Sequence, residues 1–450
     1  PMQLLPSKTL LPAPALWLGA ALAVTSLSQA ADVLSLPYNV SLLKEAFAEI
    51  VNTDSNPAPL NGPSGQTPFW VDMVNAEANN QGGDGIYVAI LDTGLVAQWP
   101  FFFPHANIRD DWGKGFTHDI YWDDDLGGLV AGPLVERNFI THAFRGSGHG
   151  THVTSTVVGY HFSTANANFL VRGVAPKVTI IPVLVLDAWE VASPYGTLYL
   201  SGGLDDMISA GIRYVADLAT THRIKIVINM SLGGPEPTAE IEDAINYALE
   251  RGVIVVASAG NSGLDGMGWP GAYPQVISAA AGGWTQQWVP VPPQTRWWLN
   301  NVTEKLNTRD LWGNNWQMYL EEFSSRPNPA LGQTWKELDV CAPGASIPGP
   351  YKPAFSLNLG YYYLWGTSMA APHVAGLAAT LAQAKPGLTQ ASAERVLKLA
   401  ATRLPLASDG AIVLDPFVGG LYDFLWKNHD AGTGWLTWDN IEKTARTQLK

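Results

Sequence analysis

The stretch Ile86-Tyr87-Val88-Ala89-Ile90-Leu91-Asp92-Thr93-Gly94 decides the fold class of this chain. Its first part is a continuous apolar run, which is typical of a strand covered on both faces. An acidic residue and a turn signal follow at once. Three further runs rich in β-branched residues occur at 178–186, 224–228 and 253–257. These runs predict the central strands of a buried sheet.

Helical patterns alternate with these strands. Between the third and fourth strand, residues 238–251 carry apolar side chains at helical spacing, and Gly252 provides a stop signal. The alternation predicts the α/β class: a three-layer, doubly wound, mostly parallel sheet with helices on both faces. In such folds, functional residues gather at the carboxyl ends of the strands.

The composition is that of a globular, acidic protein. Of the 450 residues, 47% are hydrophobic and 14% are charged, which excludes a disordered chain. The formal charge of −13 has the wrong sign for binding phosphates or anionic lipid, so we expect no nucleic-acid partner. The lone Cys341 permits no intrachain disulfide.

The N-terminal segment predicts export. Lys8 precedes an apolar run from Leu10 to Leu27, and the small residues Ser28 and Ala30 follow. This is typical of a cleaved secretion signal over residues 1–30, although an uncleaved anchor has a similar length. We therefore expect a secreted, extracellular monomer without membrane attachment after cleavage. Residues 31–67 contain a short helical pattern and a turn-rich stretch, which indicate a pro-segment or linker.

Asp92 ends the first strand, so its carboxylate is expected at the carboxyl edge of the sheet. Taken alone, Asp92-Thr93-Gly94 is equally an ordinary turn. The same three residues mark pepsin-like proteases, which need two carboxylates that share a proton. A second such motif is absent from the sequence, so that alternative requires a homodimer.

His149 lies in the glycine-rich segment Gly146-Ser147-Gly148-His149-Gly150-Thr151-His152-Val153, at the expected start of a helix. Glycine allows the backbone to approach a substrate closely, and an exposed histidine titrates near neutral pH. His149 and His152 are alternatively two metal ligands. However, no carboxylate follows at the spacing of metalloproteases.

Ser368 and Asn261 complete the set of candidate residues. Ser368 follows Gly366-Thr367 and begins a run of small apolar residues, which predicts a buried helix with the hydroxyl beside unpaired N–H groups. A helix-capping serine is the alternative. Asn261 follows the strand at 253–257, where its amide can donate to a developing oxyanion, although alone it is an ordinary loop residue.

Asp92, His149, Asn261 and Ser368, in this order and with these neighbours, resemble the subtilisin-like serine peptidases. The resemblance covers 69–444 and extends to Val174-Ala175-Pro176, Asn229-Met230-Ser231-Leu232-Gly233 and Ala342-Pro343-Gly344. It implies a catalytic domain over 68–446 that hydrolyses protein and peptide substrates without a cofactor. The order Asp, His, Ser differs from that of chymotrypsin-like and α/β-hydrolase enzymes.

The resemblance also implies a role for each residue. Ser368 is the nucleophile, His149 the general base and Asp92 the residue that orients this base, while Asn261 and the Ser368 N–H bind the oxyanion. Uncharged residues are expected to line the pocket for the substrate side chain before the cut bond. This lining predicts a preference for apolar substrate side chains. Its substrate-binding residues are Ser231, Leu232, Gly233, Ala259, Gly260 and, at the floor, Gly268.

Three features depart from the family pattern. The acidic segments 110–111 and 123–125 lie between Asp92 and His149 and are either a structural calcium site or a solvated loop. An insertion at 284–320 is expected to pack its rings locally or to wall the substrate groove. It contains Trp284, Trp288, Trp297, Trp298, Trp312 and Trp316. Residues 31–67 are short for a folding pro-domain, which leaves autoprocessing open.

Two other functions remain open at this point. One is a catalytically silent binding domain, and the other is a narrow processing peptidase or exopeptidase with the same chemistry.

Overall fold

The computed structural model describes residues 9–10, 65–79, 81–164, 167–288, 298, 318–404, 411–415, 420–427 and 429–449. The expected signal segment, apart from 9–10, and the expected pro-segment up to residue 64 lie outside the described residues. None of the helices within these ranges is long and apolar enough to cross a membrane.

A nine-stranded sheet forms the centre of the molecule, in the order β15-β14-β13-β12-β2-β9-β3-β6, with β16 also paired to β14. Only the pairs β14–β15 and β3–β6 are antiparallel, so the predicted mostly parallel sheet is confirmed. Leu91 of β2 lies opposite Met230 of β12 and Val183 of β9. The strands are β2 (Tyr87–Asp92), β3 (Lys114–Thr117), β6 (Val135–Arg137), β9 (Thr179–Leu184), β12 (Ile226–Met230), β13 (Ile254–Ser258), β14 (Ile277–Trp284), β15 (Met318–Leu320) and β16 (Val340–Pro343).

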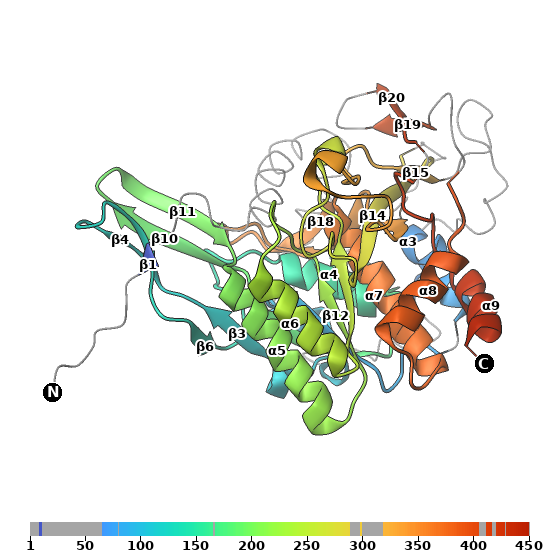
Figure 1. Cartoon of the computed structure of the whole chain (residues 1–450), viewed down its shortest axis with the longest axis horizontal. Coiled ribbons are helices and arrows are strands. Elements are labelled where there is room, and N and C mark those ends of the chain that lie inside the picture. The colour runs from blue at the N-terminus through green and yellow to red at the C-terminus, as the bar shows by residue number, and fades with distance from the viewer. Residues whose placement is uncertain are drawn as a thin grey trace.

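Helices cover both faces of this sheet, as predicted. The helices α5 (Asp205–His222) and α6 (Ala239–Glu250) pack on each other and on one face (Figure 1). On the other face, α4 (His149–Val158) contacts α7 (Thr367–Ala384), and α7 runs across β12, β13 and β14. Outside α7 lie α8 (Gln390–Ala400) and α9 (Trp438–Gln448).

A three-stranded sheet in the order β1-β5-β4, several two-stranded ribbons and one short helix surround the central layers. The ribbon of β10 and β11 projects from the end of the molecule opposite to α8 and α9 (Figure 1). The peripheral elements are α3 (Phe69–Asp72), β1 (Thr9–Leu10), β4 (Ile120–Asp123), β5 (Gly128–Ala131), β7 (Gly159–Thr164), β8 (Ala167–Arg172), β10 (Asp187–Ser193), β11 (Gly196–Gly202), β17 (Ile347–Tyr351), β18 (Gly360–Leu364), β19 (Ala411–Asp415) and β20 (Gly420–Phe424).

The insertion at 284–320 begins and ends in the central sheet, because Trp284 of β14 pairs with Met318 of β15. The ring of Trp284 packs on Phe69 of α3, with centroids 5.8 Å apart. The ring of Trp298 packs on Trp70, at 6.2 Å, and on Phe162 of β7. These two rings therefore pack on segments distant in sequence. Trp297, Trp312 and Trp316 lie outside the described residues.

Candidate active site

Asp92 and His149 meet at the carboxyl edge of the sheet. Asp92 is the last residue of β2, and His149 is the first residue of α4. The Nδ1 atom of His149 lies 2.9 Å from Oδ1 and 3.0 Å from Oδ2 of Asp92. Because an ionised carboxylate only accepts hydrogen bonds, Nδ1 is the donor in this contact, and in the neutral ring Nε2 is then the acceptor.

Close packing around this pair requires a glycine at position 150. A Cβ atom there would lie 2.4 Å from the Gly94 oxygen and 3.2 Å from Asp92 Cβ. The Gly150 N–H donates to Thr93 Oγ1 at 2.9 Å, which joins the first turn of α4 to the end of β2. The glycine at position 150 therefore allows the first turn of α4 to lie directly against Asp92.

Ser368 is the second residue of α7, and only 6% of its surface is exposed. Its Oγ donates to the Ser231 carbonyl oxygen at 3.3 Å. In the opposite direction, Ser231 Oγ donates to the Ser368 carbonyl oxygen at 2.7 Å. Pro372 has no N–H with which to bind that carbonyl, so the hydroxyl of Ser231 replaces a missing helical hydrogen bond.

The side-chain amide of Asn261 has a fixed orientation. Its Oδ1 accepts from both the N–H and the Oγ1 of Thr367, each at 2.9 Å. The Nδ2 donor therefore faces the start of α7, where it lies 3.4 Å from the position of a Cβ on Gly366. In the sequence, Thr367 is part of the serine motif and has no predicted role of its own.

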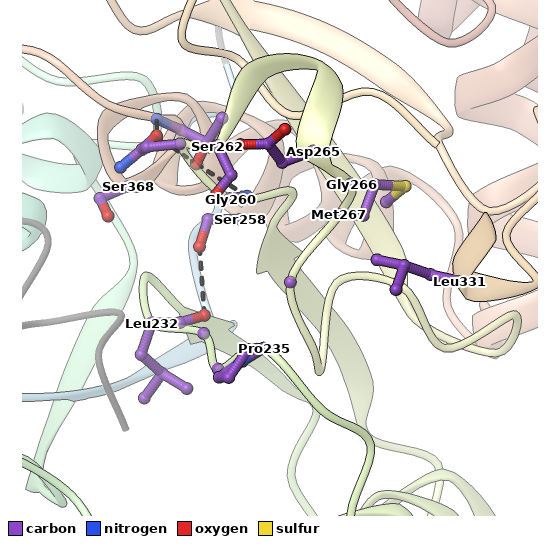
Figure 2. A pocket seen from close by; sticks show the side chains of 15 residues that line it. Leu232, Pro235, Ser258, Gly260, Ser262, Asp265, Gly266, Met267, Leu331 and Ser368 are labelled. Carbon is purple, nitrogen blue, oxygen red and sulfur yellow. Dashed lines mark hydrogen bonds between the residues drawn. The ribbon is translucent and has the colours of Figure 1, made fainter. Parts of the chain in front are cut away.

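A pocket of about 200 Å³ opens beside Ser368 and Asn261. Figure 2 shows Ser368 on one side of it and Met267 and Leu331 on the other. Its lining comes from the loops that follow β12 and β13, from Leu331 and from the start of α7: Leu232, Gly233, Gly234, Pro235, Ser258, Gly260, Asn261, Ser262, Asp265, Gly266, Met267, Gly268, Leu331, Thr367 and Ser368.

Four of the six expected substrate-binding residues line this pocket: Leu232, Gly233, Gly260 and Gly268. Ser231 and Ala259 are not among its lining residues, and their role in substrate binding stays a prediction. The Ser231 side chain turns toward α7, and Ala259 is fully buried with its N–H bound to the Ala279 oxygen. The exposed carboxylate of Asp265 is an addition, whereas the expected lining was uncharged.

The residues considered as metal ligands have other partners. His152 is fully buried, and its Nε2 lies 2.9 Å from the Ile347 oxygen. Desolvation lowers the pKa of His152 to about 3. In the acidic segments, Asp123 Oδ1 accepts from the N–H groups of Asp125 and Leu126, and Arg109 pairs with Asp111. The described ranges contain no group of three or more acidic, histidine or cysteine side chains placed to hold a metal.

Comparisons with known proteins agree with this fold. The model of the subtilase family matches residues 83–418, a range that contains the central sheet, α4 and α7. A subtilisin from Bacillus sp. (strain TA39) is 31% identical over 362 residues, covering 76% of this chain and 69% of the relative. An intracellular serine protease from Paenibacillus polymyxa is 31% identical over 343 residues, covering 74% and 76%.

Two solved protease structures have a similar fold. Sphericase superposes with a TM-score of 0.53 at 26% identity, covering 83% of this chain and 98% of its own. The S41 psychrophilic protease also has a TM-score of 0.53, at 25% identity, with coverage of 84% and 99%. The family match, the relatives and the fold lead to one conclusion: this chain is a serine peptidase of the subtilase family.

Proposed function

We propose that the chain is an endopeptidase in which Asp92, His149 and Ser368 form the catalytic triad. The observation that supports this most directly is the contact of His149 Nδ1 with both oxygens of Asp92, at 2.9 and 3.0 Å. The pocket beside the buried start of α7 supplies a place for one substrate side chain next to Ser368.

In the proposed reaction, Ser368 Oγ turns from the Ser231 oxygen toward His149 Nε2 and attacks the scissile carbonyl carbon. Catalytic hydrogen bonds of this kind often tighten only when substrate is bound. His149 takes the hydroxyl proton and gives it to the leaving amine, while Asp92 stabilises the imidazolium. The Ser368 N–H and Asn261 Nδ2 donate to the oxyanion. Water then releases the acyl group, and no cofactor takes part.

Covalent labelling tests this proposal. A fluorophosphonate should label Ser368 in the wild type, and Ser368→Ala should neither be labelled nor hydrolyse casein. The variant should remain folded, because loss of a helix-capping group costs at most about 2 kcal/mol. Ser209→Ala, a buried helical serine in α5, is the matched control and should react like the wild type.

Labelling at another residue, or hydrolysis by Ser368→Ala, would reject the triad. A wild type that binds peptides without being labelled would instead identify a catalytically silent binding domain.

We further propose a preference for large apolar side chains before the cut bond. Leu232, Met267 and Leu331 supply an apolar lining, in which a charged side chain would lose its hydration without gaining a partner. The carboxylate of Asp265 is exposed, so water screens its charge. The preference should be graded, since one methylene contributes about 1 to 3 kcal/mol in such a pocket.

Gly268→Glu should shift this preference toward Lys and Arg, because it places a carboxylate in the lining. A Cβ at this position would lie 3.3 Å from the Gly234 oxygen, so the backbone needs to move only by a few tenths of an ångström. Asp265→Asn is the control and should keep the apolar preference. Cleavage of a peptide library measures both variants. A wild type that already prefers basic residues, and loses this preference in Asp265→Asn, would show that Asp265 selects the substrate.

We also propose that the enzyme is secreted and monomeric. Residues 1–30 have the pattern of a secretion signal, and Ala31 is the expected first residue after cleavage. The mass of the protein recovered from the medium identifies its N-terminus, and light scattering gives its oligomeric state.

A further inference from the structure

Lys352 follows β17, and although it is a lysine only 4% of its surface is exposed. Its ammonium group is surrounded by backbone carbonyl oxygens. Nζ lies within hydrogen-bonding distance of the oxygens of Phe144, Pro353 and Ser356, at 3.2, 3.2 and 3.1 Å, and of the Gly146 oxygen, so its three N–H groups are shared among four acceptors. Carbonyl groups arranged in this way form the kind of site that binds a monovalent cation. We call these four oxygens the carbonyl cage.

The carbonyl cage joins two segments that are far apart in the sequence. Phe144 and Gly146 belong to the loop that leads to His149, whereas Pro353 and Ser356 belong to the turn between β17 and β18.

Backbone hydrogen bonds connect the same two segments. Phe355 N donates to the Arg145 oxygen and Ser356 N to the Phe144 oxygen, both at 3.2 Å. The rings of Phe144 and Phe355 meet edge to face. The loop before the catalytic histidine is therefore held by the turn that contains Lys352.

The contact continues to the first residues of α4. Gly148, which precedes His149, donates its N–H to the Lys352 oxygen at 2.7 Å. A Cβ atom on Gly148 would lie 2.5 Å from Lys352 N, so the two backbones are in direct contact. A displacement of Lys352 would therefore move the start of the helix that presents His149 to Asp92.

Burial of this ammonium group has a cost in free energy. Desolvation lowers the pKa of Lys352 to about 8, because water no longer solvates the charge. A methionine would fill a similar volume without this cost. The four carbonyl oxygens compensate the charge, and without it they would be left facing one another. The charge of Lys352 therefore binds the oxygens of the carbonyl cage, whereas a neutral side chain of similar size would be enough for packing.

We propose that Lys352 is a positioning residue for catalysis: its ammonium group acts as a built-in cation that holds the 144–148 loop and, through it, His149. This inference rests on the proposed function, because it assigns a role within the same reaction.

The first experiment compares Lys352→Met with Lys225→Met. Lys225 is the matched control, since its Nζ also donates to backbone carbonyls, those of Gly252 and Leu388, away from the active site. In Lys352→Met, kcat for a peptide substrate should fall about 10- to 100-fold, the effect of a small misplacement of a catalytic group, with little change in KM. Lys225→Met should keep the wild-type kcat. Equal kcat values in all three proteins would overturn the inference, as would a loss confined to KM.

Chemical rescue of kcat by an added cation is not expected if Lys352 has only a structural role, so it provides a second test. Lys352→Ala lacks the atoms of n-propylammonium, so this cation should restore kcat, whereas the neutral isostere 1-propanol should not. If the variant needs the cation during purification, activity and circular dichroism are followed after dilution. Loss of activity with an unchanged spectrum supports positioning. Parallel loss of both signals, or equal rescue by 1-propanol, overturns it.

Hydrogen exchange separates failure of this inference from failure of the proposed function. Amide exchange of residues 144–149 is measured in Ser368→Ala with and without Lys352→Met, where faster exchange is expected when the ammonium group is absent. If the wild type hydrolyses no peptide, the proposed function fails and the exchange data decide whether Lys352 holds the loop. Unchanged exchange rejects the inference in either case.

Discussion

At the residue scale, the orientation of one amide group is decided by a neighbour that the sequence does not identify. An asparagine amide presents either its oxygen or its nitrogen, and only the nitrogen can stabilise an oxyanion. Thr367 donates to Asn261 Oδ1 twice, which turns Nδ2 toward the start of α7. The sequence predicted Asn261 from its motif, but the two hydrogen bonds that orient it depend on a contact between residues 106 positions apart.

Asn261→Ala should therefore lower kcat by about a hundredfold or more, the usual effect of losing one oxyanion donor, with little change in KM. Thr367→Ser, which keeps both donors to the amide, should retain most of the wild-type kcat. Thr367→Val removes the hydroxyl donor and should lie between the other two. Steady-state kinetics on one peptide substrate measure all three variants. A raised KM with an unchanged kcat in Asn261→Ala would make Asn261 a binding residue.

At the element scale, the strands that the sequence predicted correctly are those rich in β-branched residues. The strands β2, β9, β12 and β13 contain β-branched runs, and each was predicted to within a few residues. By contrast, β14 reads Ile-Ser-Ala-Ala-Ala-Gly-Gly-Trp and carries no such signal. Its residues are small because neighbouring segments pack closely on them. A Cβ on Gly282 would lie 2.5 Å from the Tyr319 oxygen.

The same limit applies to the ribbon of β17 and β18. Pro348 and Pro350 remove donors from β17, so its sequence argues against a strand. For that reason the sequence could not predict the contact between Lys352 and the 144–148 loop, although it did predict the residues of the proposed triad.

The helix α7 shows how one element compensates for an interior proline. Pro372 leaves the Ser368 carbonyl without a helical donor, and Ser231 Oγ supplies the hydrogen bond at 2.7 Å. Ser231→Ala should lower the free energy of unfolding by about 1 to 3 kcal/mol, because a buried carbonyl loses its partner. The loss should be smaller when Pro372→Ala is also present, since the new N–H at position 372 can reach this carbonyl. Denaturation in a Ser368→Ala background avoids self-digestion. Equal losses in both backgrounds would show that Ser231 does not act through this carbonyl.

At the scale of the whole molecule, the packed helices on one face of the sheet contain two histidines that are neutral near pH 7. His152 in α4 and His373 in α7 are both fully buried. The ring of His373 lies 2.8 Å from the Met369 oxygen through Nδ1. Desolvation lowers the pKa of each ring to about 3 from an ordinary value of 6.5. Between pH 3 and pH 6.5, therefore, the two rings bind protons in the unfolded chain but stay neutral in the folded state.

Two carboxyl groups, the half-buried Glu77 and the buried Asp339, have the opposite effect on the pH dependence of stability. Desolvation raises the pKa of Glu77 to about 8 and that of Asp339 to about 7. For these groups the folded state binds protons more tightly than the unfolded chain, so they favour folding as the pH falls below those values. The total pH profile mixes both effects, and only a difference between variants isolates one histidine.

The comparison of His373→Leu with its parent, both in a Ser368→Ala background, isolates that effect. As the pH falls from 6.5 toward 3, the parent should lose stability relative to the variant, because its unfolded state alone takes up a proton on His373. The difference between the two free energies of unfolding should change by up to about 1.4 kcal/mol per pH unit in this window, and it should be constant above it. Urea denaturation at pH 7.5, 6, 5 and 4 measures this difference. A constant difference across the whole series would mean that His373 takes up a proton within the folded protein, and that its burial does not exclude the proton.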